Sequence, residues 1–117
     1  QFQVAAPKHP VMTGIQSFEI PFEEFYYKLK VPKNPKHWTS LVKVPIEGIL
    51  ETVGWAWERP DGSRSVGYSG MHFHVNWRHE QYQRLIAQAV LWSLKLPIPK
   101  DGLDPKLKPE VLELRRR

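Results

Sequence analysis

Residues 54–68, GWAWERPDGSRSVGY, predict a β-hairpin and so set the fold class. The tetrapeptide Arg59-Pro60-Asp61-Gly62 holds residue types that favour a chain reversal. The two arms carry the tryptophan, valine and serine residues of short strands. Trp55 and Trp57 share one face of the first arm, because side chains two residues apart in a strand point the same way. We interpret both, together with Trp92, as core residues.

Residues 79–94 predict the one long helix of the chain. Apolar side chains recur here at spacings of three and four residues, the pattern of a helix with one buried face. Glu80 lies near the expected N-terminus, where the helix dipole favours a negative charge. We expect this helix to pack against the sheet through Tyr82, Leu85, Ile86, Ala89, Val90 and Trp92.

Shorter segments predict further strands. Residues 27–31 alternate in polarity, and residues 38–44 are rich in β-forming side chains and stop at Pro45. A brief strand is expected within residues 1–14.

The end of the chain predicts a tail. Prolines at positions 97, 99, 105 and 109 exclude regular structure, apart from a last turn at residues 110–114. We therefore expect a domain at residues 1–96 and a proline-rich, basic tail at residues 97–117.

The composition is that of one globular domain. A length of 117 residues suffices to bury a core, and 41% of the residues are hydrophobic. No apolar run reaches the roughly 20 residues that a membrane-spanning helix needs, and no secretory signal pattern opens the sequence. The lack of cysteine excludes disulfides and thiolate chemistry. We expect a soluble protein of the cytoplasm or the periplasm, without a membrane partner.

The formal net charge of +5 does not predict a nucleic-acid partner. Arg115, Arg116 and Arg117 supply three of the excess charges from the end of the tail. Lysines elsewhere are scattered among prolines and acids instead of forming a basic stripe. We therefore expect no nucleic-acid binding.

The segment Met71-His72-Phe73-His74 pairs two of the five histidines. If the second arm of the hairpin runs on through Gly70, both imidazoles project from one face and can hold a divalent metal such as Zn²⁺. A third ligand would come from His9, Glu23 or Glu24. In the alternative interpretation, one histidine caps the helix or bonds a backbone carbonyl and the other lies at the surface.

The segment Glu23-Glu24-Phe25-Tyr26-Tyr27 offers acids and phenols to a pocket. The two glutamates face opposite sides of an extended chain, so only one of them can share a cleft with the histidines. That one could act as a general base. The alternative is an exposed acidic edge beside a buried tyrosine.

Trp77, between Asn76 and Arg78, fits a carbohydrate site. Sugar rings stack on flat aromatic surfaces, while their hydroxyls bond amide and charged side chains. Trp77 lies in a loop, where a large apolar residue commonly contacts a ligand.

Five stretches in the same order resemble the C-terminal half of trehalose-utilisation (ThuA-like) proteins. The resemblance implies an α/β fold, part of a flavodoxin-like sheet related to the class I glutamine amidotransferases. The N-terminal half of such a sheet is missing here, so we expect that the chain is a fragment, that another protein chain supplies the remainder, or that self-association closes the sheet. The stretches are His9 to Ile15, Phe18 to Tyr26, Ala56 to Gly62, Gly67 to Trp77 and Leu85 to Trp92.

The resemblance also implies a sugar-processing function. Family members take part in the breakdown of trehalose and related disaccharides, beside oxidoreductases that make 3-keto sugars. A hydrolase, lyase or isomerase acting on a keto sugar would use acid, base or metal assistance. The alternative is a non-catalytic carbohydrate-binding or assembly module of a larger complex. The expected roles are catalytic for His72, His74 and Glu24, metal-binding for His72 and His74, and substrate-binding for His9, Glu23, Tyr26, Asn76, Trp77 and Arg78.

Overall fold

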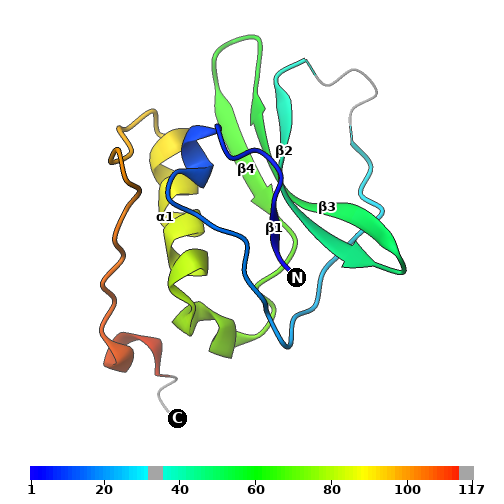
Figure 1. Ribbon diagram of the computed structural model, residues 1–117. Coiled ribbons are helices and arrows are strands. Elements are labelled where there is room, and N and C mark those ends of the chain that lie inside the picture. Colours follow the sequence, from blue (N-terminus) through cyan, green and yellow to red (C-terminus); the bar gives the residue numbers. More distant parts are fainter. Residues whose placement is uncertain (32–35, 114–117) are drawn as a thin grey trace.

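The fold is a four-stranded antiparallel sheet with one long helix packed on one of its faces (Figure 1). It is seen in a computed structural model, which describes residues 1–31 and 36–113. The strands are hydrogen-bonded in the order β1-β2-β3-β4, which is also their order along the chain. The elements are β1 (Gln3–Val4), the 3-10 helix η1 (Pro10–Met12), β2 (Trp38–Ile46), β3 (Ile49–Glu58), β4 (Arg64–Tyr68), the 3-10 helix η2 (His74–Arg78), α1 (Glu80–Ser93) and the 3-10 helix η3 (Pro109–Leu112).

The hairpin predicted at residues 54–68 is confirmed by the antiparallel pairing of β3 with β4. Its turn is closed by the Arg59 N–H, which donates to the Ser63 carbonyl O at 2.8 Å. The Asp61 carboxylate accepts from the Ser63 N–H at 2.8 Å, as aspartate commonly does in turns. Local turn chemistry therefore fixes this half of the sheet.

A second hairpin, which the sequence interpretation missed, joins β2 to β3. Glu47 and Gly48 form its turn with φ values of 51° and 79°, as in the type I′ turns that hairpins favour. The strand predicted at residues 38–44 is present but runs on through Pro45. Proline is tolerated there because β1 pairs with β2 no farther along than Lys43, so that edge of β2 needs no donor.

The strand predicted at residues 27–31 is wrong, whereas a short strand near the N-terminus is confirmed. Lys28 has a φ of 55°, in the left-handed region, which breaks an extended segment. The alternating polarity has another cause: Tyr27 and Leu29 are half-buried against the protein, and Lys28 and Lys30 are exposed. The segment is an irregular chain lying along the molecule.

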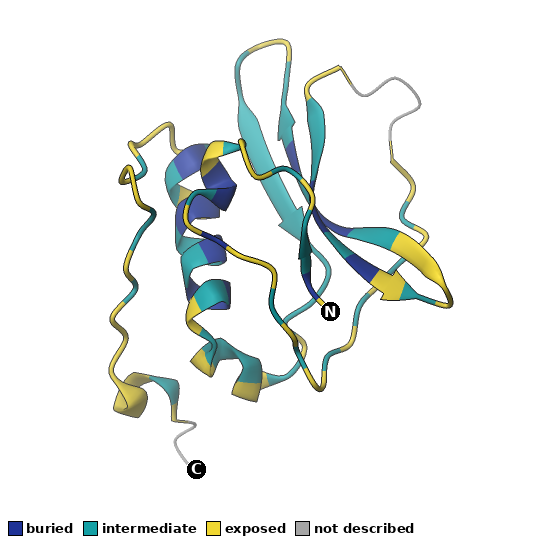
Figure 2. Ribbon diagram, in the orientation of Figure 1, coloured by how far each residue is buried: buried dark blue, intermediate teal, exposed yellow. Residues whose placement is uncertain are grey.

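The helix predicted at residues 79–94 is confirmed as α1. His79 caps its N-terminus, because the imidazole Nδ1 accepts from the Gln81 N–H at 3.3 Å. The buried residues gather where α1 faces the sheet (Figure 2). None of the helices in residues 1–31 and 36–113 is long and apolar enough to cross a bilayer. The core consists of Phe2, Val11, Met12, Ile15, Leu41, Val42, Val44, Val53, Ala56, Tyr82, Leu85, Ala89 and Trp92.

The architecture is α+β, with an antiparallel sheet, where the resemblance implied part of a parallel one. Each strand pair among the described residues runs antiparallel. The reason is connection length: β2 and β3 are joined by residues 47–48, and β3 and β4 by residues 59–63. Parallel neighbours need a crossover of a dozen or more residues.

The tryptophans of the hairpin do not lie in the core. Trp55 and Trp57 share one face of β3 as predicted, but Ala56 between them is the residue that enters the core. Trp92 is buried on α1 and confirms the expectation for that residue. The alternation of side chains along a strand shows which residues share a face, but it does not show which face of the sheet the helix covers.

The tail predicted from residue 97 is bound to the domain and runs back along α1 (Figure 1). The Arg84 Nε donates to the Leu103 carbonyl O at 2.6 Å, and the Gln88 Oε1 accepts from the Leu103 N–H at 2.7 Å. The last turn is present as η3, whereas Leu114 and the three terminal arginines lie outside the described residues. Residues 97–103 are thus an integral layer over the helix.

Candidate functional site

The carboxylate of Glu23 ties the segment before β2 to the chain that follows β4. A carboxylate has about four acceptor positions, and this one accepts five hydrogen bonds, so no position is left for a ligand. Glu23 therefore acts first as a structural anchor. Its donors are the N–H groups of Glu24 (3.0 Å), Met71 (2.9 Å) and His72 (3.1 Å), the Asn76 Nδ2 (2.8 Å) and the Tyr82 hydroxyl (3.2 Å).

Two phenols, the half-buried Tyr68 and the buried Tyr82, continue this network into the core. The Tyr68 hydroxyl donates to the Tyr82 hydroxyl at 2.8 Å, and Tyr82 donates to Glu23. Burial raises the pKa of both tyrosines well above the ordinary value, and the nearby Glu23 carboxylate raises it further. Both hydroxyls therefore stay protonated and serve as donors.

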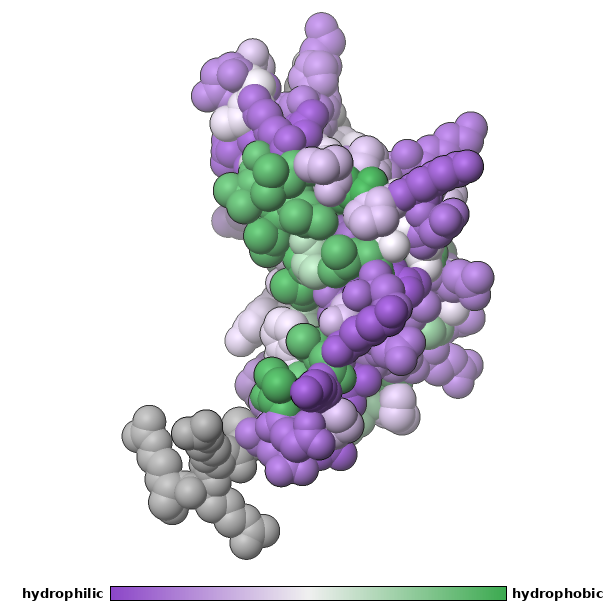
Figure 3. Space-filling view, turned by 90° about the vertical axis from the view of Figure 1, so that its left-hand side faces the viewer, coloured by the Kyte–Doolittle hydropathy of each residue, from purple (hydrophilic) through white to green (hydrophobic). Residues whose placement is uncertain are grey.

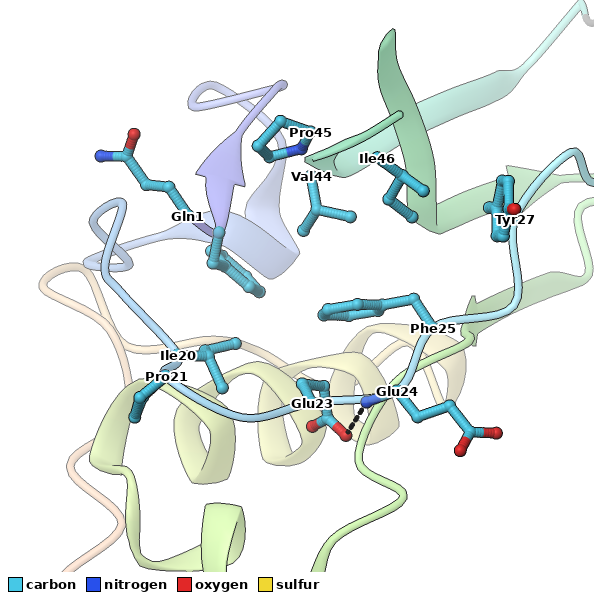
Figure 4. A pocket seen from close by; sticks show the side chains of 11 residues that line it. Gln1, Ile20, Pro21, Glu23, Glu24, Phe25, Tyr27, Val44, Pro45 and Ile46 are labelled. Atoms are coloured by element: carbon cyan, nitrogen blue, oxygen red, sulfur yellow. Dashed lines mark hydrogen bonds between the residues drawn. The ribbon is translucent and has the colours of Figure 1, made fainter. Parts of the chain in front are cut away.

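Beside this anchor, a groove opens between residues 20–27 and the end of β2 (Figure 4). We call it the Glu24 groove; its volume is about 440 Å³. The ring of Phe25 crosses it, with Val44 and Ile46 on the opposite wall. The side chain of Glu24 is exposed at the rim, pointing away from Glu23, and makes no hydrogen bond to a described residue. The lining residues are Gln1, Phe2, Ile20, Pro21, Glu23, Glu24, Phe25, Tyr27, Val44, Pro45 and Ile46.

The strand expected to carry His72 and His74 is not formed. β4 ends at Tyr68, Met71 has a left-handed φ of 68°, and His74 begins η2. His74 Nε2 lies 2.7 Å from the Leu112 carbonyl O. His72 is exposed, and its ring packs edge-on against the neighbouring Phe73. The alternative interpretation of the pair, with one imidazole on a backbone carbonyl and the other at the surface, describes this arrangement.

The zinc site expected at His72 and His74 stays a prediction. In the described ranges, no three histidine, aspartate or glutamate side chains gather closely enough to hold a metal ion. A His74 Nε2 that donates to Leu112 would leave only its Nδ1 for a metal. A third protein ligand would therefore have to come from beyond these ranges.

The other predicted binding residues are spread over separate places. Asn76 joins the Glu23 network, while Tyr26 is exposed and is held through its backbone by Ser69. The carbonyl O of Trp77 accepts from the Gln83 Nε2 at 2.7 Å. Arg78 lines a hollow of about 460 Å³ shared with His74, Val75, Leu112 and Glu113.

His9 stands apart from this region and has a structural role. Its Nδ1 accepts from the Val11 N–H at 3.2 Å and so caps η1. Its ring packs edge-on against Trp92, with centroids 4.9 Å apart. Burial lowers the pKa of His9, although nearby Glu58 acts in the opposite direction. The structure thus brings Glu23 and Glu24 together with the backbone of His72, but not with the imidazole of His9.

The sequence interpretation missed Tyr68 and Tyr82 as partners of the acidic cluster. Both carry a hydroxyl that needs a partner where water is excluded, and Tyr82 is placed by the helical spacing on the buried face of α1. A tyrosine at a position predicted to be buried could therefore have indicated a polar partner nearby. Phe25 and Tyr27 were noted only as part of the acidic segment, although both line the groove.

The two capping histidines predict that the protein becomes less stable in mild acid. Burial lowers the pKa of both His9 and His79 below 6.5 in the folded state. Between the folded and unfolded pKa values the unfolded chain binds more protons, so the free energy of unfolding falls as the pH drops below about 6.5. Urea unfolding at about pH 7.5 and about pH 5 measures this loss.

The control for this prediction is the double variant His9→Asn, His79→Asn. Asparagine also accepts a hydrogen bond as an N-cap but does not titrate. The variant should lose less stability than the native chain over the same pH range. An equal loss in both proteins would contradict the prediction.

Similarity to known proteins gives no further guide to function. Comparison of the chain with known protein families, with curated proteins and with solved structures finds no match. The resemblance to ThuA-like proteins therefore rests on the order of the motifs, and function has to be inferred from the residues and their geometry.

Proposed function

We propose that this chain is a carbohydrate-binding domain whose ligand occupies the Glu24 groove. The observation that carries the proposal is the combination of walls and acid in this groove: aromatic and aliphatic side chains line it, and the Glu24 carboxylate stands at its rim. Sugar rings present apolar C–H faces and hydroxyl edges, which need these two kinds of partner.

The dimensions and the rigidity of the groove suit a small sugar. Its volume of about 440 Å³ falls at the lower end of the range for small-molecule sites. The Glu23 anchor fixes the segment that carries Glu24 and Phe25, so the wall is preorganised and little order is lost on binding. Tyr27, held by its hydroxyl to Glu47 at 3.2 Å, closes one end.

A sugar-processing enzyme of the ThuA-like type is the stricter form of the same proposal. In it Glu24 would be the base that removes a proton next to the carbonyl of a keto sugar. The groove is lined by no imidazole, and Glu23 has no free acceptor position to serve as a second group. Binding without turnover is therefore the better-supported form.

Assembly with another polypeptide is proposed alongside carbohydrate binding. An antiparallel sheet can take a further strand at its edge, and among the described residues β4 lies at one edge of the sheet. An apolar groove of about 430 Å³ lies beside this edge, and Val90 and Leu94 on α1 are 53% and 64% exposed. The side of the molecule seen in Figure 3 carries hydrophobic surface. These features suit an extended, apolar strand from a neighbouring chain.

Replacement of Glu24 by glutamine is expected to weaken carbohydrate binding about tenfold. The carboxylate accepts sugar hydroxyls as a charged acceptor, and a lost charge-assisted hydrogen bond has an effect of this size. Titration of the labelled protein with trehalose and other disaccharides, followed by NMR, gives the dissociation constants. Glu19→Gln is the matched control, because Glu19 is exposed and lies outside the groove.

Three outcomes separate the proposals. Shifts that avoid residues 20–27 would contradict the groove as the site. Conversion of a 3-keto disaccharide that stops in the Glu24→Gln variant would establish the enzyme. If the protein binds no sugar and its mass in solution exceeds the 13.7 kDa of one chain as that of an oligomer would, assembly is left as the function.

A further inference from the structure

Three tryptophans share the face of the sheet that points away from the core. Trp38 and Trp57 are directly opposite each other in β2 and β3, so their side chains lie on one face. Trp55 lies on the same face of β3, two residues earlier. All three remain half-buried. Large aromatic residues gathered on an outer face need a reason other than core packing.

Gly67 in β4 shapes this aromatic surface. It pairs with Trp55, and a Cβ atom at Gly67 would overlap the six-membered ring of the Trp55 indole. The missing side chain therefore lets the indole lie across the neighbouring strand. The half-buried Trp55 side chain also lines a small pocket on this face.

Residues 29–31 convert the surface into a slot. Leu29, Lys30 and Val31 line one side, and the three tryptophans line the other. We call this space the tryptophan slot; its volume is about 240 Å³, and its lining is mainly apolar. A space below the usual range for drug-sized ligands suits one ring.

The charges around the tryptophan slot are positive. Lys30 lines it, and the Arg59 guanidinium lies over the Trp57 ring, 4.7 Å from the centroid. Among the described residues, no acidic side chain lines the slot. The indole faces would suit a cation, but these two side chains oppose one. The favoured guest is therefore a single ring that is apolar on one face and carries a negative charge.

We propose that the tryptophan slot binds a uronic acid unit, that is, a pyranose ring with a carboxylate. The C–H face of the ring stacks on the indoles, and the carboxylate pairs with Lys30. The site is separate from the Glu24 groove, since the two share no lining residue. The proposal therefore does not depend on the proposed function of that groove.

The test is a titration of the labelled protein with a tetramer of galacturonic acid, followed by the indole N–H signals in NMR. The signals of Trp38, Trp55 and Trp57 should shift, and those of Trp77 and Trp92 should not. Trp57→Ala should weaken binding about tenfold. Glu24→Gln should leave this binding unchanged, which separates the two sites.

A second variant keeps the test valid if Trp57→Ala fails to fold. Lys30→Gln changes an exposed side chain and should weaken binding about threefold, as the loss of a surface ion pair does. Lys100→Gln removes the same charge from an exposed position outside the slot and should have no effect. Equal dissociation constants for these two variants would overturn the role of Lys30.

Three other outcomes would overturn the proposal. Equally tight binding of neutral maltotetraose would show that no acidic sugar is recognised. Larger shifts with a short thymidine oligonucleotide would make the surface a single-strand platform instead. A lack of shift at all three indoles would show that they only pack against residues 29–31.

Discussion

Replacing Gln88 with leucine is expected to lower the free energy of unfolding by about 3 kcal/mol. Gln88 is fully buried on α1, and its side chain makes three hydrogen bonds. Its Nε2 donates to the carbonyl O of Val11 at 2.7 Å and of Thr13 at 3.0 Å, while its Oε1 accepts from the Leu103 N–H. Leucine fills similar space but leaves these backbone groups without partners, at a cost of about 1–3 kcal/mol each where water cannot reach them.

Urea unfolding measures this loss. Gln81→Leu is the matched control on the same helix, because the Gln81 side chain accepts one long, exposed hydrogen bond from the Gln16 N–H at 3.3 Å. Its effect should stay within about 0.5 kcal/mol. A loss below about 1 kcal/mol for Gln88→Leu would mean that residues 11–13 and 103 find other partners, and the integral role of the tail would be wrong.

Replacing Glu23 with alanine is expected to cost about 2–3 kcal/mol of stability. The change removes the acceptor of Asn76, Tyr82 and two N–H groups after β4. Part of the site is open to water, so some donors are resolvated and the loss is smaller than the number of bonds suggests. The neighbouring variant Glu24→Ala should change stability by less than about 0.5 kcal/mol.

The two glutamates thus have opposite expected signatures. Glu23→Ala should lower stability strongly and affect sugar binding only through the groove wall. Glu24→Ala should leave stability nearly unchanged and weaken sugar binding directly. If Glu23→Ala keeps full stability and loses all binding, Glu23 is a ligand residue, and its role as an anchor is refuted.

The parts of the fold that local chemistry encodes could be predicted from the sequence. The turn at residues 59–62 and the helical spacing at residues 79–94 both act within a few positions, and both elements formed where expected. The turn at Glu47 and Gly48 was missed because Pro45 was interpreted as the end of the strand. Only the absence of a neighbour beside that part of β2 makes proline acceptable there.

The candidate site could be predicted only in part. Glu23 and Asn76 were both singled out, but their hydrogen bond joins positions 53 residues apart, which no local pattern reveals. The strand expected to carry the histidine pair was wrong, because the left-handed Met71 redirects the chain after β4. Trp55 and Trp57 were wrongly assigned to the core, because alternation shows which residues share a face of a strand but not which face the helix covers.

The contact between Gln88 on α1 and the backbone of residues 11–13 also constrains when the protein can fold. Its hydrogen bonds span 75 and 77 positions, and the core joins Phe2 to Tyr82. During synthesis, residues 11–13 therefore lack these hydrogen-bond donors until α1 has been made. We expect Val11 and Met12, which are buried in the folded protein, to stay exposed until α1 is available to pack on them.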